Sequence, residues 1–308
     1  MRIRGTLKYD ENTDIVYYKW YLEGQEPKAI IHISHGMAEH ILRYDEFANK
    51  LVDAGFAVYG EDHYAHGESS TDIKKIGVIT EKDFMSTIID DMKLTVELIK
   101  KEHPGLPIYG FCHSMGSFAA QRYIQLYPND YSKVILSGSS NTNFEHYLGR
   151  VLTRIIMTFR GKTHYSSLVQ KMSIDKFNKP YKDLLGKNHW LSSVTEEVDK
   201  YNENEYCGAA FPVNYYYSLS KLMTEVTKKA NYKNINSNLE LFLISGSNDP
   251  VSNNGKGILK LYNFLKNLGL KVDYKLYENG RHELINEVLD IKNQVIQDIV
   301  EFYQSNNQ

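Results

Sequence analysis

Three polar residues of this chain have the types that covalent hydrolysis by a serine requires. Ser114 lies in the stretch GFCHSMGS, and Asp249 and His282 follow it far along the chain. A serine hydroxyl is a weak nucleophile at neutral pH, so a neutral imidazole must accept its proton during attack. A carboxylate holds that imidazole in the correct tautomer and stabilises the imidazolium that forms. The three residue types therefore predict a catalytic triad and an acyl-enzyme intermediate.

Each of the three residues follows a short apolar stretch that is typical of a strand buried in a sheet. These stretches are residues 106–113, 239–247 and 271–278. In an open α/β sheet, ligands and chemistry lie in the loops at the carboxyl ends of the strands. We therefore expect the three residues to meet at one edge of a parallel sheet. Their order along the chain, serine, acid and histidine, is that of the α/β-hydrolases.

Each residue also has a structural alternative when it is taken alone. A serine between a strand and a helix is often an N-cap, and Asp249 followed by Pro250 is a common turn. Most of the eleven histidines are expected to be structural or exposed. The joint arrangement, with each type after its own strand and in the correct order, favours the triad.

The turn around Ser114 makes two further predictions. A nucleophile elbow is so tight that the residues two before and two after the serine must be small, and Gly116 and Cys112 are both small. Cys112 is an alternative nucleophile, but it lies within the predicted strand and not at the exposed turn. The backbone N–H of Met115 opens a helix, where it is placed to stabilise a developing oxyanion.

The alternation of strands and helices predicts the fold class α/β, an α/β-hydrolase fold. We expect a mostly parallel sheet with helices on both faces and an antiparallel hairpin within the first 28 residues. Residues 1–140 and 237–308 are predicted to form this core. Residues 141–236 contain no strand that could extend the sheet, so they predict an inserted helical cap, or lid. The helices expected in the core span residues 44–55, 81–102, 114–128, 255–269 and 283–304.

The predicted cap is rich in apolar and aromatic residues, concentrated at residues 144–159. We expect most of these side chains to form the cap's own core and a minority to line an acyl tunnel. The stretch RVLTRIIMTFRGK, residues 150–162, is both basic and apolar, and is therefore suited to transient contact with a membrane surface while the cap opens. A buried cap helix is the favoured alternative.

Composition excludes several classes of partner. A formal net charge of −2 gives no electrostatic argument for binding nucleic acid. No apolar run is long enough for a transmembrane segment, and MRIRGTLKYDENT lacks the apolar region of a signal peptide. The two cysteines, Cys112 and Cys207, offer neither a disulfide framework nor a CxxC metal site. We expect a cytoplasmic protein that needs no cofactor and no metal, and the sequence makes no prediction of its oligomeric state.

Longer motifs resemble the monoacylglycerol lipase and lysophospholipase family of serine α/β-hydrolases. The stretch HGMAEHILRY is similar to the family's HG-x-x-EH-x-x-RY, and CHSMG, GSNDPVS and NGRHE resemble its elbow, acid loop and histidine loop. The family's D-x-x-GHG-x-S motif is altered here, with Tyr64 and Ala65 in the places of its usual arginine and glycine. The resemblance implies a small-molecule or lipid ester substrate: a monoacylglycerol, a lysophospholipid or a similar carboxylic ester.

The resemblance also implies roles for residues near the triad. The backbone N–H of Met37 would be the second oxyanion donor beside that of Met115. Glu39 and Arg43 would form an ion pair under the site, either near a glycerol-like leaving group or with a purely structural role. His113 would shape the oxyanion loop or contact the substrate.

Two other functions remain open. One is an aminopeptidase-like amide hydrolase of the same fold, although CHSMG differs from the Gly-Gly-Ser-Trp-Gly elbow of such enzymes. The other is a non-catalytic binding protein, although such proteins usually lose a triad member. Dehalogenases and epoxide hydrolases are excluded because they require an aspartate at the position of Ser114.

Overall fold

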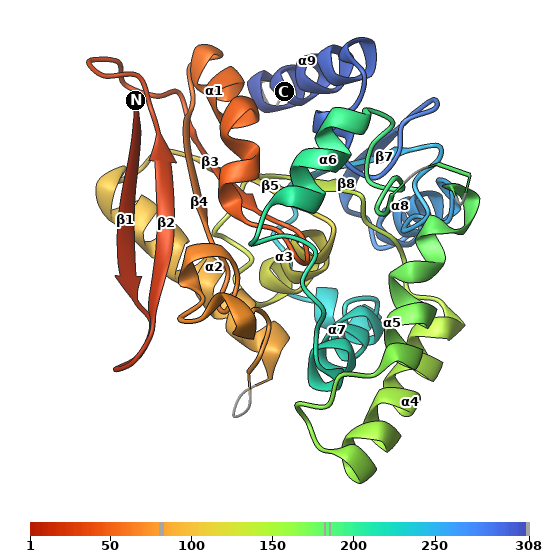
Figure 1. Cartoon of the computed structure of the whole chain (residues 1–308). Coiled ribbons are helices and arrows are strands. Elements are labelled where there is room, and N and C mark those ends of the chain that lie inside the picture. Colours follow the sequence, from red (N-terminus) through yellow and green to blue (C-terminus); the bar gives the residue numbers. More distant parts are fainter. Residues whose placement is uncertain (80–82, 182, 185, 306–308) are drawn as a thin grey trace.

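The computed structural model describes residues 1–79, 83–181, 183–184 and 186–305, which include an eight-stranded sheet (Figure 1). Its strand order is β1-β2-β4-β3-β5-β6-β7-β8. The pairs β1–β2 and β2–β4 are antiparallel, and all the other neighbours are parallel, which confirms the predicted sheet. The strands span Arg2–Lys8, Asp14–Trp20, Ile30–Ser34, Ala57–Glu61, Ile108–His113, Lys133–Ser137, Glu240–Gly246 and Lys271–Tyr277, numbered β1 to β8 in that order.

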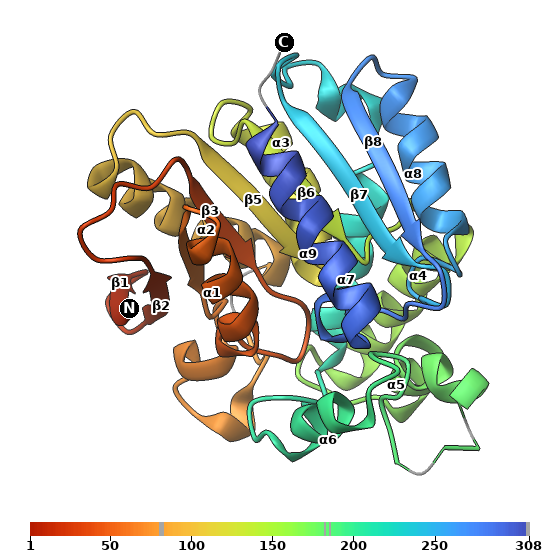
Figure 2. The same ribbon diagram turned by 90° about the horizontal axis from the view of Figure 1, so that it is seen from above.

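Helices cover both faces of the sheet (Figure 2). Helices α1 (Asp45–Asp53) and α9 (Leu289–Gln304) share one apolar core with one face of the sheet. Helices α2 (Phe84–Glu102), α3 (Met115–Leu126) and α8 (Lys256–Lys266) share a second core with the other face. The central strands are therefore buried on both sides, which is why their sequences are almost continuously apolar.

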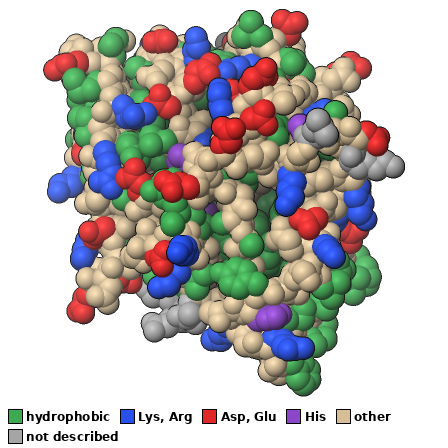
Figure 3. All heavy atoms as spheres, viewed as in Figure 1, with side chains coloured by type: hydrophobic (Ala, Val, Ile, Leu, Met, Phe, Trp, Pro, Cys, Tyr) green, Lys and Arg blue, Asp and Glu red, His purple; other side chains and the backbone are tan. Residues whose placement is uncertain are grey.

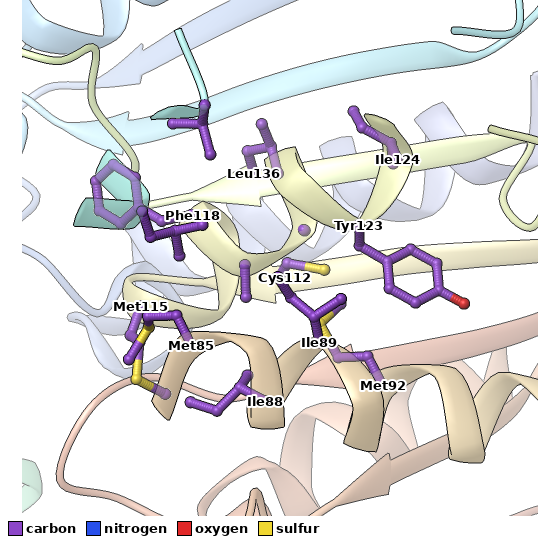
Figure 4. Packing of buried hydrophobic residues seen from close by; sticks show 14 of the residues in the cluster. Met85, Ile88, Ile89, Met92, Cys112, Met115, Phe118, Tyr123, Ile124 and Leu136 are labelled. Carbon is purple, nitrogen blue, oxygen red and sulfur yellow. The ribbon is translucent and has the colours of Figure 1, made fainter. Parts of the chain in front are cut away.

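The packing of α2 against α3 fixes the helix that follows Ser114. Met85, Ile88 and Met92 of α2 recur every three or four residues and share one buried cluster with Met115 and Phe118 of α3; Figure 4 shows Met85 beside Met115. All five side chains are buried, and complete burial of such a side chain stabilises a fold by about 1.5–3 kcal/mol. The start of the predicted helix at residues 81–82 lies outside the described residues.

The prediction for the last helix was wrong at its start. α9 begins at Leu289 and not at Glu283, because residues 284–286 form a separate 3-10 turn. The N–H of Glu283 donates to the carbonyl of Leu191 over 2.7 Å, so it is committed outside a helix. This turn, Leu284–Asn286, is labelled η6. The other 3-10 turns are η1 Ile41–Tyr44, η2 Gly67–Ser69, η3 Ile73–Lys75, η4 Asp175–Tyr181 and η5 Lys229–Tyr232.

The connection from β6 to β7, which we call the β6–β7 segment (residues 138–239), is helical. Its described residues contain no strand. Within it, α4 and α7 pack along each other, and the segment lies over one end of the molecule (Figure 1). Its α-helices are α4 Phe144–Arg160, α5 Ser167–Ser173, α6 Thr195–Glu203 and α7 Val213–Glu225.

α4 is not the buried helix that the sequence favoured. Its inner side, with Ile156 and Met157, packs against the core, while a row of large apolar side chains points outward. Figure 3 shows these side chains gathered at the lower right of the molecule. In the part of the chain that the structure describes, no helix has both the length and the hydropathy to cross a bilayer. The outward row, here named the α4 apolar face, consists of Phe144, Tyr147, Leu148, Val151, Ile155 and Phe159, each between 49% and 81% exposed.

Candidate active site

Ser114 occupies a sharp turn between β5 and α3. Its backbone has φ 50° and ψ −118°, a conformation that non-glycine residues rarely adopt and that is typical of a nucleophile elbow. The N–H of Ser114 donates to the carbonyl of Ser137 over 2.9 Å, and Ser117 Oγ donates to the carbonyl of Ser114 over 2.6 Å. These bonds hold the strained turn, and Ser114 remains partly exposed at the edge of the sheet.

The residues two before and two after Ser114 are both enclosed. A Cβ added at Gly116 would lie 2.4 Å from the carbonyl oxygen of Ser34 and 2.6 Å from that of His35, so only glycine fits there. Cys112 is fully buried among the apolar side chains of α2 and α3 (Figure 4). Burial raises the pKa of the Cys112 thiol, which keeps it protonated. These properties argue against Cys112 as the nucleophile.

Asp249 lies in the loop after β7 and is paired with His282. The distance from His282 Nδ1 to Asp249 Oδ1 is 3.0 Å, and neither residue is more than 1% exposed. Asp249 also accepts hydrogen bonds from the N–H of Val251 and from Ser245 Oγ. Burial alone would raise the pKa of Asp249, but the charge and hydrogen bond of His282, with the other two donors, lower it below its ordinary value. The Asp249 carboxyl group is therefore ionised.

His282, in the loop after β8, has one ring nitrogen occupied and one free. Its Nδ1 bonds to Asp249, so the hydrogen of the neutral ring lies on Nδ1 and the lone pair on Nε2. That Nε2 has no hydrogen-bond partner among the described residues. Burial tends to lower the pKa of His282, but the charge of Asp249 and its hydrogen bond outweigh burial and raise the pKa above its ordinary value of 6.5.

The elbow and His282 are brought together, although no hydrogen bond between Ser114 and His282 is present among the described residues. The ring centroid of His113, the residue before Ser114, lies 4.6 Å from that of His282. A Cβ added at Gly138, which follows the carbonyl that binds Ser114, would lie 2.7 Å from His282 Cε1. Catalytic hydrogen bonds are often loose without substrate and tighten when it binds.

The two predicted oxyanion donors follow neighbouring parallel strands. Met37 lies in the turn after β3, and Met115 begins α3 after β5. A Cβ added at Gly36 would lie 3.2 Å from Ser114 Cβ, so the loop after β3 closely approaches the serine. The N–H of a first helical residue such as Met115 has no acceptor within its own helix. The residues that carry both amides therefore lie close to the serine, as the predicted oxyanion hole requires.

Arg43 joins the loop after β3 to the loop after β8. Its guanidinium donates to Glu39 Oε2 over 2.5 Å and to the two carboxylate oxygens of Glu283 over 2.8 and 2.6 Å. Glu39 Oε1 in turn accepts the N–H of Gly36 over 2.6 Å. Burial would raise the pKa of Glu283, but Arg43 overrides it and lowers the pKa to about 2.

The ion pair between Glu39 and Arg43 is the contact that the resemblance implied, whereas Glu283 was missed. The sequence contained a signal for it, because Glu283 directly follows His282 in NGRHE. The three side chains form one bridge between the predicted oxyanion loop and the histidine loop.

Three buried histidines shape the loops around the serine. His35 Nδ1 donates to the carbonyl of Gly36 over 2.7 Å, and the N–H of His63 donates to His35 Nε2. Burial lowers the pKa of His35 to about 3 and that of His113 to about 4, so both rings are neutral. Among the described residues, no group of three or more histidine, cysteine, aspartate or glutamate side chains is placed to hold a metal ion.

Trp190, from the β6–β7 segment, lies beside the site, although the sequence predicted no site role for it and most apolar residues of the cap were expected to form the cap's own core. Its ring centroid lies 5.0 Å from that of His282, and its carbonyl accepts the N–H of His282 over 3.3 Å. Arg281 Nη1 donates to the carbonyls of His189 and Ser192 on either side of it. The chain contains two tryptophans, and their scarcity is the sequence signal that could have marked Trp190.

Comparisons with known proteins find a family and relatives that match most of this chain. The family described as serine aminopeptidase, S33, matches residues 25–288. The monoglyceride lipase homolog of Monkeypox virus is 24% identical over 292 residues, which are 94% of this chain and 95% of that protein. The human monoglyceride lipase is 26% identical over 281 residues, or 89% of this chain and 81% of that protein.

Solved structures share the overall fold of this chain. A thermostable carboxyl esterase from Bacillus coagulans, in complex with glycerol, superposes with a TM-score of 0.89 at 22% identity and covers 98% of this chain and 97% of its own. A monoglyceride lipase variant from Saccharomyces cerevisiae, in complex with a substrate analog, gives 0.75 at 16% identity and covers 97% and 94%. At these identities the similarity establishes the α/β-hydrolase fold.

Proposed function

Because the chain belongs to the α/β-hydrolase family described as serine aminopeptidase, S33, we propose that it is a serine ester hydrolase of monoacylglycerols, lysophospholipids or similar carboxylic esters. One observation carries the proposal: His282, held by Asp249 at Nδ1 and free at Nε2, lies beside the elbow of Ser114. The similarity to proteins named as monoglyceride lipases supports the choice of ester.

The proposed reaction has two halves. His282 Nε2 accepts the proton of Ser114 Oγ as that oxygen attacks the acyl carbon, while Asp249 stabilises the imidazolium. The N–H groups of Met37 and Met115 donate to the oxyanion, and one such donor is typically worth about 2.7–4 kcal/mol of barrier. His282 then gives its proton to the alcohol oxygen as the ester bond breaks. Water, deprotonated by the same Nε2, hydrolyses the acyl-enzyme and regenerates Ser114.

Residues 141–236 act in this proposal as a cap over the site. Trp190 and Leu191 are hydrogen-bonded through their carbonyls to the backbone of the histidine loop, so this part of the cap is anchored beside the triad. α4 lies at the outer side of the cap, where its apolar face is uncovered. A cap with one anchored end and one apolar outer surface can admit a lipid and shield its acyl chain from bulk water.

The α4 apolar face contacts an anionic lipid surface in this proposal. Its side chains follow helical spacing, so they form one stripe along α4. Arg154, Arg160 and Lys162 lie exposed on the same helix and at its end. A basic residue near an anionic membrane surface adds about 1 kcal/mol to binding, and buried apolar area supplies the rest. The proposed substrates reside in such surfaces.

The decisive experiment on the reaction is the Ser114→Ala variant. We expect a fall in the hydrolysis of a long-chain monoacylglycerol and of a short nitrophenyl ester on the order of 10⁴- to 10⁶-fold, as removal of a triad nucleophile produces. A fluorophosphonate probe should label the wild type and not Ser114→Ala. Hydrolysis by the variant at a rate near that of the wild type refutes the assignment, and a folded wild type that resists the probe favours a binding protein.

A second candidate, amide hydrolysis, is favoured by the family's description as an aminopeptidase. The same triad can cleave an amide, so the substrate decides between the two. We expect kcat/KM for monoacylglycerols and lysophospholipids to exceed kcat/KM for aminoacyl nitroanilides. The reverse order would replace the ester proposal with the amide one.

A further inference from the structure

The indole ring of Trp190 lies against His282 within a small apolar cluster. Trp190 is 7% exposed and also packs against Phe177, whose ring centroid is 5.1 Å away. Leu191 and Tyr201 complete the same small buried cluster. The backbone of Trp190 is fixed to the histidine loop, since its carbonyl accepts the N–H of His282. The ring is therefore held in place independently of any ligand.

One polar atom of this ring is unsatisfied. Trp190 Nε1 has no hydrogen-bond partner among the described residues, although it is buried. Buried N–H groups in proteins almost always have an acceptor, so an orphan of this kind requires an explanation. The other tryptophan, Trp20, is also buried, but its Nε1 donates to Asp45 over 2.8 Å.

The packing of the Trp190 ring on His282 indicates which part of a substrate the indole lies nearest. His282 Nε2 is the second unsatisfied polar atom here, and in the proposed reaction it delivers a proton to the leaving alcohol. A group packed on the ring of His282 is therefore nearer to the alcohol part of an ester than to the far end of its acyl chain. An N–H donor needs an oxygen acceptor, which the hydroxyl groups of a glycerol head group provide.

We propose that Trp190 is a specificity-determining residue whose indole N–H donates to a hydroxyl oxygen of the substrate's glycerol-like head group. This role rests on the proposed function of Ser114 and His282. It adds the criterion by which the site selects an ester, because a site built around a hydrogen bond loses that bond with an analogue that lacks the hydroxyl. Esters of simple alkanols would leave the indole N–H unpaired.

The test compares two esters of one fatty acid, a 1-monoacylglycerol and the propyl ester, which has the same three carbons without the hydroxyls. In Trp190→Phe, which keeps an aromatic ring but removes the N–H, we expect kcat/KM for the monoacylglycerol to fall about tenfold, with the propyl ester changed by less than about threefold. Trp20→Phe is the matched control, since it removes a tryptophan N–H that binds Asp45, and it should leave the ratio of the two esters unchanged.

The possible outcomes separate this role from the proposed function. Equal losses on both esters, or no loss on either, overturn the role of Trp190 while the hydrolase stands. If the wild type hydrolyses neither ester, the proposed function and this role fail together.

A second measurement follows the fluorescence of Trp190 itself in a variant that binds the ester but does not hydrolyse it. In Ser114→Ala, saturating monoacylglycerol should shift the indole fluorescence to longer wavelength, because the N–H gains an acceptor, and the propyl ester should not. The same titration of Ser114→Ala with Trp190→Phe identifies the emitting ring. Identical spectra with both bound esters would overturn the proposal.

Discussion

His282 experiences two opposing effects, and their balance predicts the pH dependence of the reaction. Burial disfavours the imidazolium, but Asp249 more than compensates and raises the pKa above 6.5. A general base must be neutral, so kcat/KM on a soluble nitrophenyl ester should fall as pH decreases through a midpoint above 6.5. The contribution of His282 to stability has the opposite sign: it is complete below the unfolded pKa and is lost as pH rises through the folded pKa.

Asp249→Asn provides the control for this pH profile. Removing the negative charge should move the acid midpoint to lower pH and reduce kcat by about 10⁴-fold, because the imidazole loses its correct tautomer. An unchanged midpoint in Asp249→Asn would assign the titration to another group.

Arg43 should be important for stability because it is the common partner of two buried carboxylates. The side chains of Glu39 and Glu283 are 4% and 6% exposed. In Arg43→Met both charges lose their partner, and we expect the free energy of unfolding to fall by about 3–5 kcal/mol in urea titrations. The matched control is Arg2→Met, since Arg2 pairs with Asp45 at the surface and should change stability by less than about 1 kcal/mol. Similar losses in the two variants would contradict this interpretation.

For single residues, the sequence predicts the types and the order of the site residues better than it predicts which residues they contact. Ser114, Asp249 and His282 could be selected because the chemistry requires those side chains after strands. The bond between Arg43 and Glu283 joins residues 240 positions apart, and no local pattern specifies which glutamate an arginine will meet. The same holds for Trp190, whose neighbour His282 comes from another part of the chain.

At the scale of elements, two helical glycines have opposite requirements. A Cβ at Gly116 in α3 would overlap two backbone carbonyls, whereas at Gly149 in α4 the nearest atom is Ser220 Oγ at 3.4 Å. Gly116→Ala should destabilise the protein by about 1–3 kcal/mol and reduce kcat by about 100-fold as the elbow shifts. Gly149→Ala should stabilise it by about 0.5–1 kcal/mol through helix propensity. Thermal unfolding and ester hydrolysis measure both effects, and a Gly116→Ala variant with full stability and activity would disprove the tight elbow.

Element boundaries depend on contacts that periodicity does not contain. The strands were predicted because apolar runs bounded by turn residues suit a sheet covered on both faces. The start of α9 was placed too early because Glu283 is in a helical pattern but its N–H binds Leu191. For α4, spacing predicts an apolar stripe but not whether another element covers it.

At the scale of the whole molecule, the parallel sheet explains how residues 114, 249 and 282 come to one place. The loops after β5, β7 and β8 leave the same edge, and the β6–β7 segment rises from that edge with Trp190. The resemblance to monoacylglycerol lipases seen in HGMAEH and CHSMG is confirmed by the family match. The α4 apolar face could not be predicted from the motifs, since it depends on how the segment packs.

The α4 apolar face predicts how the whole molecule binds to a lipid surface. Replacing Val151 and Ile155 together by aspartate should weaken binding to anionic phospholipid vesicles about tenfold or more, because two apolar anchors are lost. Binding by the wild type should weaken as salt is raised, since Arg154 and its basic neighbours are screened. The control is Leu259→Asp on α8, an exposed leucine (41%) outside α4, which should bind vesicles as the wild type does. All variants should hydrolyse a soluble short ester normally, because α4 contributes none of the proposed catalytic groups. Equal vesicle binding by the double variant and the wild type would show that α4 does not face the lipid.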